Sequence, residues 1–532
     1  MRVARVLPMG QRGFMRKFRI ALLALAWTSA AGARAEVAFA PIFNDDAVLQ
    51  CEMPVNLWGK SAPSAGLEIR LDGKKVASAK ADGGGSWKTI LPAQPPGGPH
   101  SLEAVSGEDA AELKGILFGE VWLAAGQSNM VLPVGPSLGG AEALKRENSG
   151  IRFLKVPQKT GLPVEKEFTA DDLKWRALKP GQPSRDNDFS AVAFYFADAL
   201  HQGTDRPIGI IQSAYGGTPA EAWTSLDMLE GHPELKKYAR ATRQARELKK
   251  TKEQWQEEIN TWDQFVAALA EWKKGGSSDP RPTEPTRPAA GNPWSPRSPG
   301  VLFENMIAPL VPYTARGVIW YQGEGNATKP DEYRVLFPTM IEGWRKLWGR
   351  PDWPFLFVQL SAFETPSAGD WAGLRAAQTF TRDTVPHTGM AVSIDCGEKD
   401  DIHPKKKQPV GERLARLALA DVYGKPIASR GPMFQALEKS NGSLRINFQG
   451  FENGLQTSDG KPDVPGFEVA GADGVFHAAQ AKIVSTSSVE LTCAETADPV
   501  SARYAWVNWP EPPVTLQNSA GLPAEPFSKI AK

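Results

Sequence analysis

One serine, in the segment "AAGQSNM" at 124–130, is the residue best suited to covalent chemistry. Ser128 follows the apolar run "VWL" and a glycine, so the sequence predicts a strand that ends in a tight turn and presents the hydroxyl. A serine hydroxyl is a weak nucleophile. It needs a base within hydrogen-bond reach, and a third group must orient that base.

Among the six histidines of the chain, His403 is the strongest candidate for the base. It lies in "EKDDIHPKKK", beyond the predicted strand "MAVSID", and Asp400 and Asp401 directly precede Ile402. A carboxylate two or three residues away can accept the Nδ1–H of the imidazole and leave Nε2 facing the serine. Pro404 then marks the expected start of the next helix. Without Ser128, a capping aspartate beside an incidental histidine would be the better interpretation.

Acyl transfer also needs hydrogen-bond donors for the developing oxyanion. The segment "QSAYGGTPAEAW" offers the backbone N–H of Gly216 or Gly217, and "WYQGEGNA" offers the side chains of Gln322 and Asn326. Either loop alone is readily explained as a plain turn. Together with the serine and histidine loops, they indicate one catalytic site.

The pattern from about 116 to 427 explains how these loops can meet. Short apolar runs such as "IGIIQSA" and "GVIWYQ" alternate with amphipathic segments such as "SAVAFYFADALHQ" and "EYRVLFPTMIEGWRKLW". This alternation predicts a parallel sheet covered by helices on both faces. In such sheets, ligands bind beyond the carboxyl ends of the strands, where all four loops begin.

The predicted domain organisation surrounds this unit with β structure. Residues 36–113 are expected to form a β-sandwich, 114–427 the α/β domain, and 428–532 a C-terminal β domain. A helical and Pro-rich insertion is predicted at 228–300, where Trp255, Ile259, Trp262, Val266 and Leu269 follow a helical period. The insertion can either wall in a substrate or decorate the surface.

Composition bounds the function further. Residues 1–35 combine a basic stretch, the apolar "IALLALAWTSAAGA" and a small-x-small "ARA", which predicts a signal peptide and an exported, periplasmic or secreted protein. No other segment is long and apolar enough to predict an integral membrane span.

A net charge of +1 gives no reason to expect a nucleic acid partner. The three cysteines favour neither a disulfide framework nor a zinc site, and the sequence leaves any pairing and the oligomeric state open.

The motifs resemble those of the SGNH (GDSL-like) hydrolases, and more specifically the sialate O-acetylesterase family of carbohydrate esterases. The resemblance runs from roughly 38 to 527 and rests on "GQSNM", "GGTPAEAW", "WYQGEGNA" and "DIHPKKKQPVGERLA". It implies a three-layer α/β/α sandwich with a parallel sheet, flanked by N-terminal and C-terminal β domains. It also implies an acetyl-enzyme mechanism without a metal or organic cofactor, acting on an acetylated carbohydrate.

Carried over residue by residue, the resemblance makes Ser128 the nucleophile and His403 the base. The oxyanion donors are then the N–H groups of Ser128 and Gly217 with the side chain of Asn326 or Gln322. The wider D-x-x-H pattern selects Asp400 as the acid, whereas the "DIH" of the narrower group selects Asp401, and Asp400 is slightly favoured. Candidates for substrate contacts are Gln127, Trp223, Glu324 and Arg375.

Two other functions are compatible with the fold. An esterase of acetylated xylan or another plant polysaccharide would use the same motifs. A catalytically silent carbohydrate-binding protein would have lost the nucleophile or the base, and both are present. A metal-dependent hydrolase using "DDIH" lacks a second cluster at ligand spacing.

Overall fold

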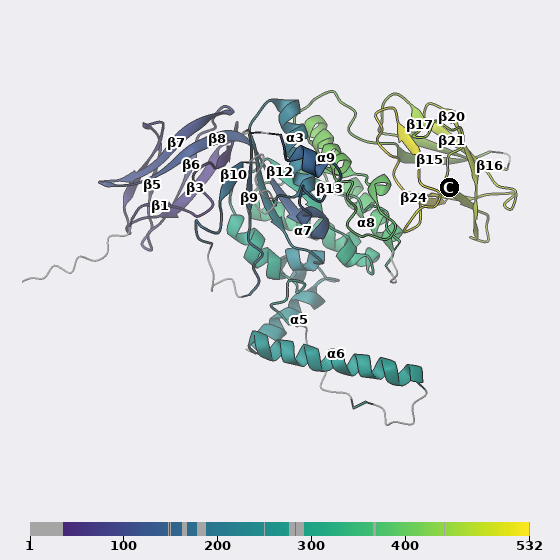
Figure 1. Ribbon diagram of the computed structural model, residues 1–532, viewed down its shortest axis with the longest axis horizontal. Coiled ribbons are helices and arrows are strands. Elements are labelled where there is room, and N and C mark those ends of the chain that lie inside the picture. Colours follow the sequence, from purple (N-terminus) through teal and green to yellow (C-terminus); the bar gives the residue numbers. More distant parts are fainter. Residues whose placement is uncertain are drawn as a thin grey trace, which may run out of the picture.

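The computed structural model describes residues 36–146, 148, 150–161, 168–177, 188–248, 250–275, 282–283, 292–364, 369–440 and 442–530 (Figure 1). The signal peptide predicted at 1–35 and most of the Pro-rich part of the insertion lie outside these residues. The protein is mixed α/β, with a large central sheet and additional β structure at both ends of the molecule.

The central sheet carries the predicted parallel strands. Their order is β9, β11, β8, β12, β13 and β14, and β10 adds an antiparallel edge next to β9. Each run is almost wholly apolar because a parallel strand is buried on both faces. The strands are β8 (Asp109–Gly126), β9 (Ile151–Lys155), β10 (Trp175–Ala177), β11 (Ile208–Ala214), β12 (Gly317–Tyr321), β13 (Phe355–Val358) and β14 (Thr388–Ala391).

Helices cover both faces of this sheet. Trp122 of β8 packs on Phe196 of α3, and Trp320 of β12 packs on Phe337 and Trp344 of α7. Because Trp122 pairs with Gly317, three residues before Trp320, the two tryptophans point to opposite faces. Helix α9 contacts α3, and α8 contacts α7. The bounds are α3 (Ala191–Thr204), α7 (Pro330–Trp348), α8 (Trp371–Thr384) and α9 (Gln408–Asp421).

The start of α9 differs from the sequence-based expectation. The helix begins at Gln408, not at Pro404, and Pro409 occupies its first turn. Residues 401–407 therefore form an irregular loop that carries His403.

Strand β8 stands where the chain changes direction within the sheet. The strands that follow it in sequence, β9 and β11, lie on one side, and β12, β13 and β14 lie on the other. Such a switch point opens a crevice beyond the carboxyl end of the central strand. Ser128 follows β8 and so lies at the mouth of this crevice.

The N-terminal β strands form two layers, but they do not end at residue 113. Strand β8 runs unbroken through the predicted boundary at 113/114, pairing with β7 and then with β11 and β12. One strand thus joins the two parts of the molecule. The remaining strands are β1 (Ala38–Phe39), β2 (Val48–Gln50), β3 (Val55–Lys60), β4 (Gly66–Leu71), β5 (Lys74–Lys80), β6 (Ser86–Leu91) and β7 (Gly97–Ser106).

The insertion after β11 contains helices α4 (Leu226–Glu230), α5 (Lys236–Glu247) and α6 (Lys252–Gly275). In Figure 1, α6 projects away from the central sheet. Within the described ranges, no helix has the length and apolar character needed to cross a bilayer.

The C-terminal part is β structure, as predicted. It comprises β15 (Met433–Ser440), β16 (Ser443–Gln449), β17 (Leu455–Thr457), β18 (Phe467–Ala470), β19 (Phe476–Ala478), β20 (Gln480–Ser485), β21 (Ser488–Thr492), β22 (Ser501–Tyr504), β23 (Leu516–Asn518) and β24 (Phe527–Ile530). The segment between β22 and β23 returns to the central domain, where Lys399 forms an ion pair with Glu511.

Candidate active site

The turn after β8 presents Ser128 at the start of the short helix α1 (Ser128–Val131). Gly126 has a φ of 139°, and a side chain there would meet the carbonyl oxygen of Tyr321 at 2.1 Å. Only glycine allows this close approach of β8 and β12. Gln127 then anchors the turn, since its N–H donates to Tyr321 O at 2.9 Å and its Oε1 accepts from Gly325 N at 3.0 Å. Gln127 is buried and holds the loop after β12.

The loop after β11 lies directly beside the serine. A side chain on Gly216 would lie 3.6 Å from Ser128 Cβ. Gly217 has a left-handed φ of 68°, which favours glycine. Among the described hydrogen bonds, none engages the backbone N–H of Ser128 or of Gly217. Both N–H groups therefore remain candidates for oxyanion donors, since no described residue accepts from them.

Asn326 and Gln322, the two candidates for a third donor, bond each other. Gln322 Nε2 donates to Asn326 Oδ1 at 2.7 Å and to Thr218 O at 3.3 Å, which occupies both of its hydrogens. Asn326 Nδ2 donates to Glu221 Oε2 at 2.8 Å and retains one hydrogen without a described partner. Asn326 is therefore the better candidate for the third oxyanion donor, and the hydrogen bond from Gln322 holds its side-chain oxygen.

His403 lies next to Asp401 in the loop before α9. The distance from His403 Nδ1 to Asp401 Oδ1 is 3.7 Å, and the same oxygen accepts from His403 N at 2.8 Å. Asp400 is exposed, and no described contact joins it to His403. The Nδ1 distance exceeds a hydrogen bond, although catalytic hydrogen bonds often tighten only when substrate binds. The geometry favours Asp401 over Asp400, against the preference drawn from the D-x-x-H pattern.

A buried polar cluster fastens the histidine loop to the serine helix. Asn129 Nδ2 donates to Ile402 O at 3.0 Å and to Glu324 Oε1 at 2.5 Å, and Lys407 Nζ donates to Asn129 Oδ1 at 2.5 Å. Asn129 follows Ser128 and Ile402 precedes His403, so these bonds join the loop of the candidate nucleophile to the loop of the candidate base.

Burial strongly affects the two charged members of this cluster. It lowers the pKa of Lys407 to about 8 and raises the pKa of Glu324. Glu324 Oε2 is buried without a hydrogen-bond partner among the described residues. Asn129 and Lys407 were not predicted as site residues, although they lie inside the motifs "GQSNM" and "DIHPKKKQPVGERLA".

Replacing Asn129 by alanine is expected to lower the free energy of unfolding by about 2–4 kcal/mol. The variant would leave the Lys407 ammonium and the Glu324 carboxyl buried without their amide partner. Urea unfolding measures the change. Gln408→Ala, at the exposed position next to Lys407, serves as the control and should unfold as the wild type does. An unchanged midpoint for Asn129→Ala would show that the cluster contributes no stability.

Two predicted substrate contacts lie inside the protein instead. Trp223 is fully buried, and its indole N–H donates to Thr218 Oγ1 at 3.0 Å. Arg375 is also fully buried, and its guanidinium donates to Val507 O at 2.7 Å and Asn508 O at 3.0 Å. Burial lowers the pKa of Arg375 to about 9. As placed, neither side chain offers surface to a ligand, and Arg375 joins the central domain to the C-terminal strands.

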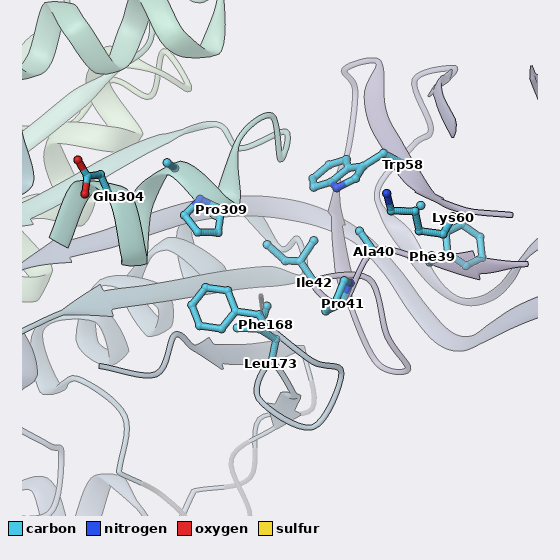
Figure 2. A pocket seen from close by; sticks show the side chains of 12 residues that line it. Phe39, Ala40, Pro41, Ile42, Trp58, Lys60, Phe168, Leu173, Glu304 and Pro309 are labelled. Atoms are coloured by element: carbon cyan, nitrogen blue, oxygen red, sulfur yellow. The ribbon is translucent and has the colours of Figure 1, made fainter. Parts of the chain in front are cut away.

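The cavity in Figure 2 lies apart from this site. It measures about 390 Å³ and lies between β3 and the segments around Phe168 and Pro309. None of its lining residues belongs to the predicted site.

The three cysteines are unpaired. In the described part of the chain, no group of three His, Cys, Asp or Glu side chains could hold a metal ion.

Relatives of known activity cover almost the whole chain. The sialate O-acetylesterase of Mus musculus is 31% identical over 542 residues, which span 92% of this chain and 93% of that protein. The chain belongs to the sialate O-acetylesterase family. The human sialate O-acetylesterase is 30% identical and covers 92% of each chain. A family model described as a carbohydrate esterase, sialic acid-specific acetylesterase, matches residues 289–420.

A solved structure of similar fold agrees with this assignment. The crystal structure of a carbohydrate acetylesterase from Xanthomonas citri matches with a TM-score of 0.76 and 32% identity, covering 93% of this chain and 99% of that chain. This member of the sialate O-acetylesterase family is therefore a carboxylic ester hydrolase of the carbohydrate esterase type.

Proposed function

We propose that the chain is an exported serine esterase of the SGNH type, with a three-layer α/β/α core, that removes O-acetyl groups from sialic acids. The observation that carries the mechanism is the meeting of the serine and histidine loops through Asn129 and Ile402. The substrate class is supported by the family of the chain and its sialate O-acetylesterase relatives. Export rests on the basic and apolar pattern of residues 1–35.

In the proposed first step, Ser128 Oγ attacks the acetyl carbonyl carbon while His403 Nε2 takes the hydroxyl proton. Asp401 holds the imidazole in the required orientation and stabilises the imidazolium. The oxyanion accepts hydrogen bonds from the backbone N–H groups of Ser128 and Gly217 and from Asn326 Nδ2. Each such donor contributes roughly a hundredfold to a thousandfold in rate.

The second half of the reaction returns the enzyme to its starting state. The carbon–oxygen bond to the sugar breaks, and the sugar hydroxyl leaves with the proton held by His403. His403 then takes a proton from water, which attacks the acetyl group on Ser128. Acetate leaves as the serine recovers its proton.

Acetate release by the purified protein tests this proposal. The substrates are 9-O-acetylated N-acetylneuraminic acid, acetylated xylan oligosaccharides and a neutral aryl acetate. Preferred release from the sialic acid supports the proposed substrate. Preferred release from xylan would instead assign a plant-polysaccharide acetylesterase, and no release from any of the three would overturn the esterase mechanism.

A further inference from the structure

The last part of the insertion, residues 292–300, forms an arm held against the active-site loops. Asn292 organises the arm, since its Oδ1 accepts from Trp294 N at 2.9 Å and its backbone O accepts from Ser295 N at 3.0 Å. At the end of the arm, Gly300 N donates to Glu221 O at 3.0 Å. The Glu221 side chain accepts a hydrogen bond from Asn326, so the end of the arm contacts the residue that holds a proposed oxyanion donor.

A second contact fixes the arm from the side of helix α5. The guanidinium of Arg246 lies 5.0 Å from the ring centroid of Trp294. The same guanidinium forms two hydrogen bonds to Glu304, at 2.9 and 2.8 Å, in a bidentate pair that is mostly buried. Because stacking and ion pairing act together, the position of the arm is well defined.

Arg297 lies at the exposed tip of this arm and faces the oxyanion loop. A side chain on Gly217 would lie 3.9 Å from Arg297 Nη1, whereas one on Gly216 would lie 3.6 Å from Ser128 Cβ. The guanidinium and the nucleophile thus flank the same two-glycine turn. Within the described residues, no ion pair or side-chain hydrogen bond engages the Arg297 guanidinium.

A guanidinium that pairs with no described residue, on a fixed arm beside the proposed catalytic serine, is suited to an anionic substrate. Its planar donors match a carboxylate in a bidentate geometry. A sialic acid carries its carboxylate and the hydroxyl at position 9 at opposite ends of the molecule. A cation on the far side of the two-glycine turn from Ser128 can bind one end of such a substrate while the ester at its other end lies at the serine.

We propose that Arg297 binds the carboxylate of an acidic sugar whose O-acetyl group reacts at Ser128. This inference rests on the proposed esterase function and adds the residue that selects the substrate class. An acetylated xylose unit carries no charge and would gain nothing from Arg297.

The test compares the full-length wild type with Arg297→Gln on 9-O-acetylated N-acetylneuraminic acid, on its C1 carboxamide and on a neutral aryl acetate. For the carboxylate substrate, Arg297→Gln is expected to lower kcat/KM about tenfold to a hundredfold, mainly through KM, because a charge-assisted hydrogen bond is lost. The carboxamide and the aryl acetate should be hydrolysed as by the wild type. Arg445→Gln, at an exposed position of β16, is the matched control and should leave all three rates unchanged.

A binding measurement supplements the kinetics. Free N-acetylneuraminate should inhibit aryl acetate hydrolysis competitively in the wild type and about tenfold or more weakly in Arg297→Gln. Equal losses on all three substrates would overturn the proposal and assign Arg297 to the oxyanion or to stability. A wild type that hydrolyses the carboxylate and the carboxamide equally would also overturn it, while the esterase function would stand. Inactivity of the wild type on every ester would refute the proposed function itself.

Discussion

Replacement of Ser128 by alanine is expected to lower kcat for acetyl ester hydrolysis by a factor of about 10⁴ to 10⁶. The proposed reaction requires a covalent bond between the serine oxygen and the acetyl carbon, and alanine provides no nucleophile. The N–H groups that bind the oxyanion remain in the variant, so a small residual rate over water is expected. Acetate release under saturating substrate measures the change.

The same variant should fold as the wild type does. The Ser128 side chain is half-buried and forms no described hydrogen bond, so its removal is expected to change the free energy of unfolding by no more than about 0.5 kcal/mol. Ser78→Ala, at an exposed position of β5, is the control for both activity and unfolding. A folded Ser128→Ala protein with wild-type kcat would contradict the serine mechanism.

The central sheet was predictable because buried parallel strands have a simple sequence pattern. "IGIIQSA" predicts a strand that the structure forms over the same residues, Ile208–Ala214. Its flanking segments carry turn residues that mark both ends. Because parallel strands place their carboxyl ends at one edge of the sheet, the sequence alone assigns the four loops that follow them to that edge.

The boundary within β8 was not predictable from the same pattern. The partly exposed stretch at 109–115 passes into a buried run at 116–126, whose one charged residue is Glu120, without a turn of the kind that ends a strand. The pattern shows that β8 passes from a half-exposed sheet to a buried one. The strands that pair with β8 change there, but its backbone stays extended. The sequence therefore indicates where burial increases, not where the strand stops.

The roles of Trp223 and Arg375 depended on contacts that the sequence does not display. Arg375 donates to backbone carbonyls at 507 and 508, more than 130 residues away. From the sequence alone, an arginine close to a predicted loop is easily interpreted as a ligand-binding residue, because the carbonyls that it bonds lie far away in the chain. Asn129 presents the converse case, because no sequence periodicity reveals that its side chain bonds Glu324, Ile402 and Lys407.

Exchange of Asp401 for asparagine is expected to lower kcat about a hundredfold to ten-thousandfold, whereas Asp400→Asn should retain wild-type kcat within about twofold. Asparagine keeps an oxygen that can accept from His403 N, so the loop should stay folded. It lacks the negative charge that orients the imidazole and stabilises the imidazolium. Of the two aspartates, Asp401 is the one placed to supply that charge, at 3.7 Å from His403 Nδ1.

Paired measurements of kcat and KM on the two variants distinguish a local role from a structural one. A defect in orientation of the base should appear in kcat with little change in KM, because the ester does not contact Asp401 in the proposed site. A larger loss in Asp400→Asn would contradict the assignment and show that the loop at 400–403 rearranges when substrate binds. Asp400 and Asp401 are adjacent on one loop, and each variant removes one negative charge. Each variant is therefore the control for the effect of the other on folding and net charge.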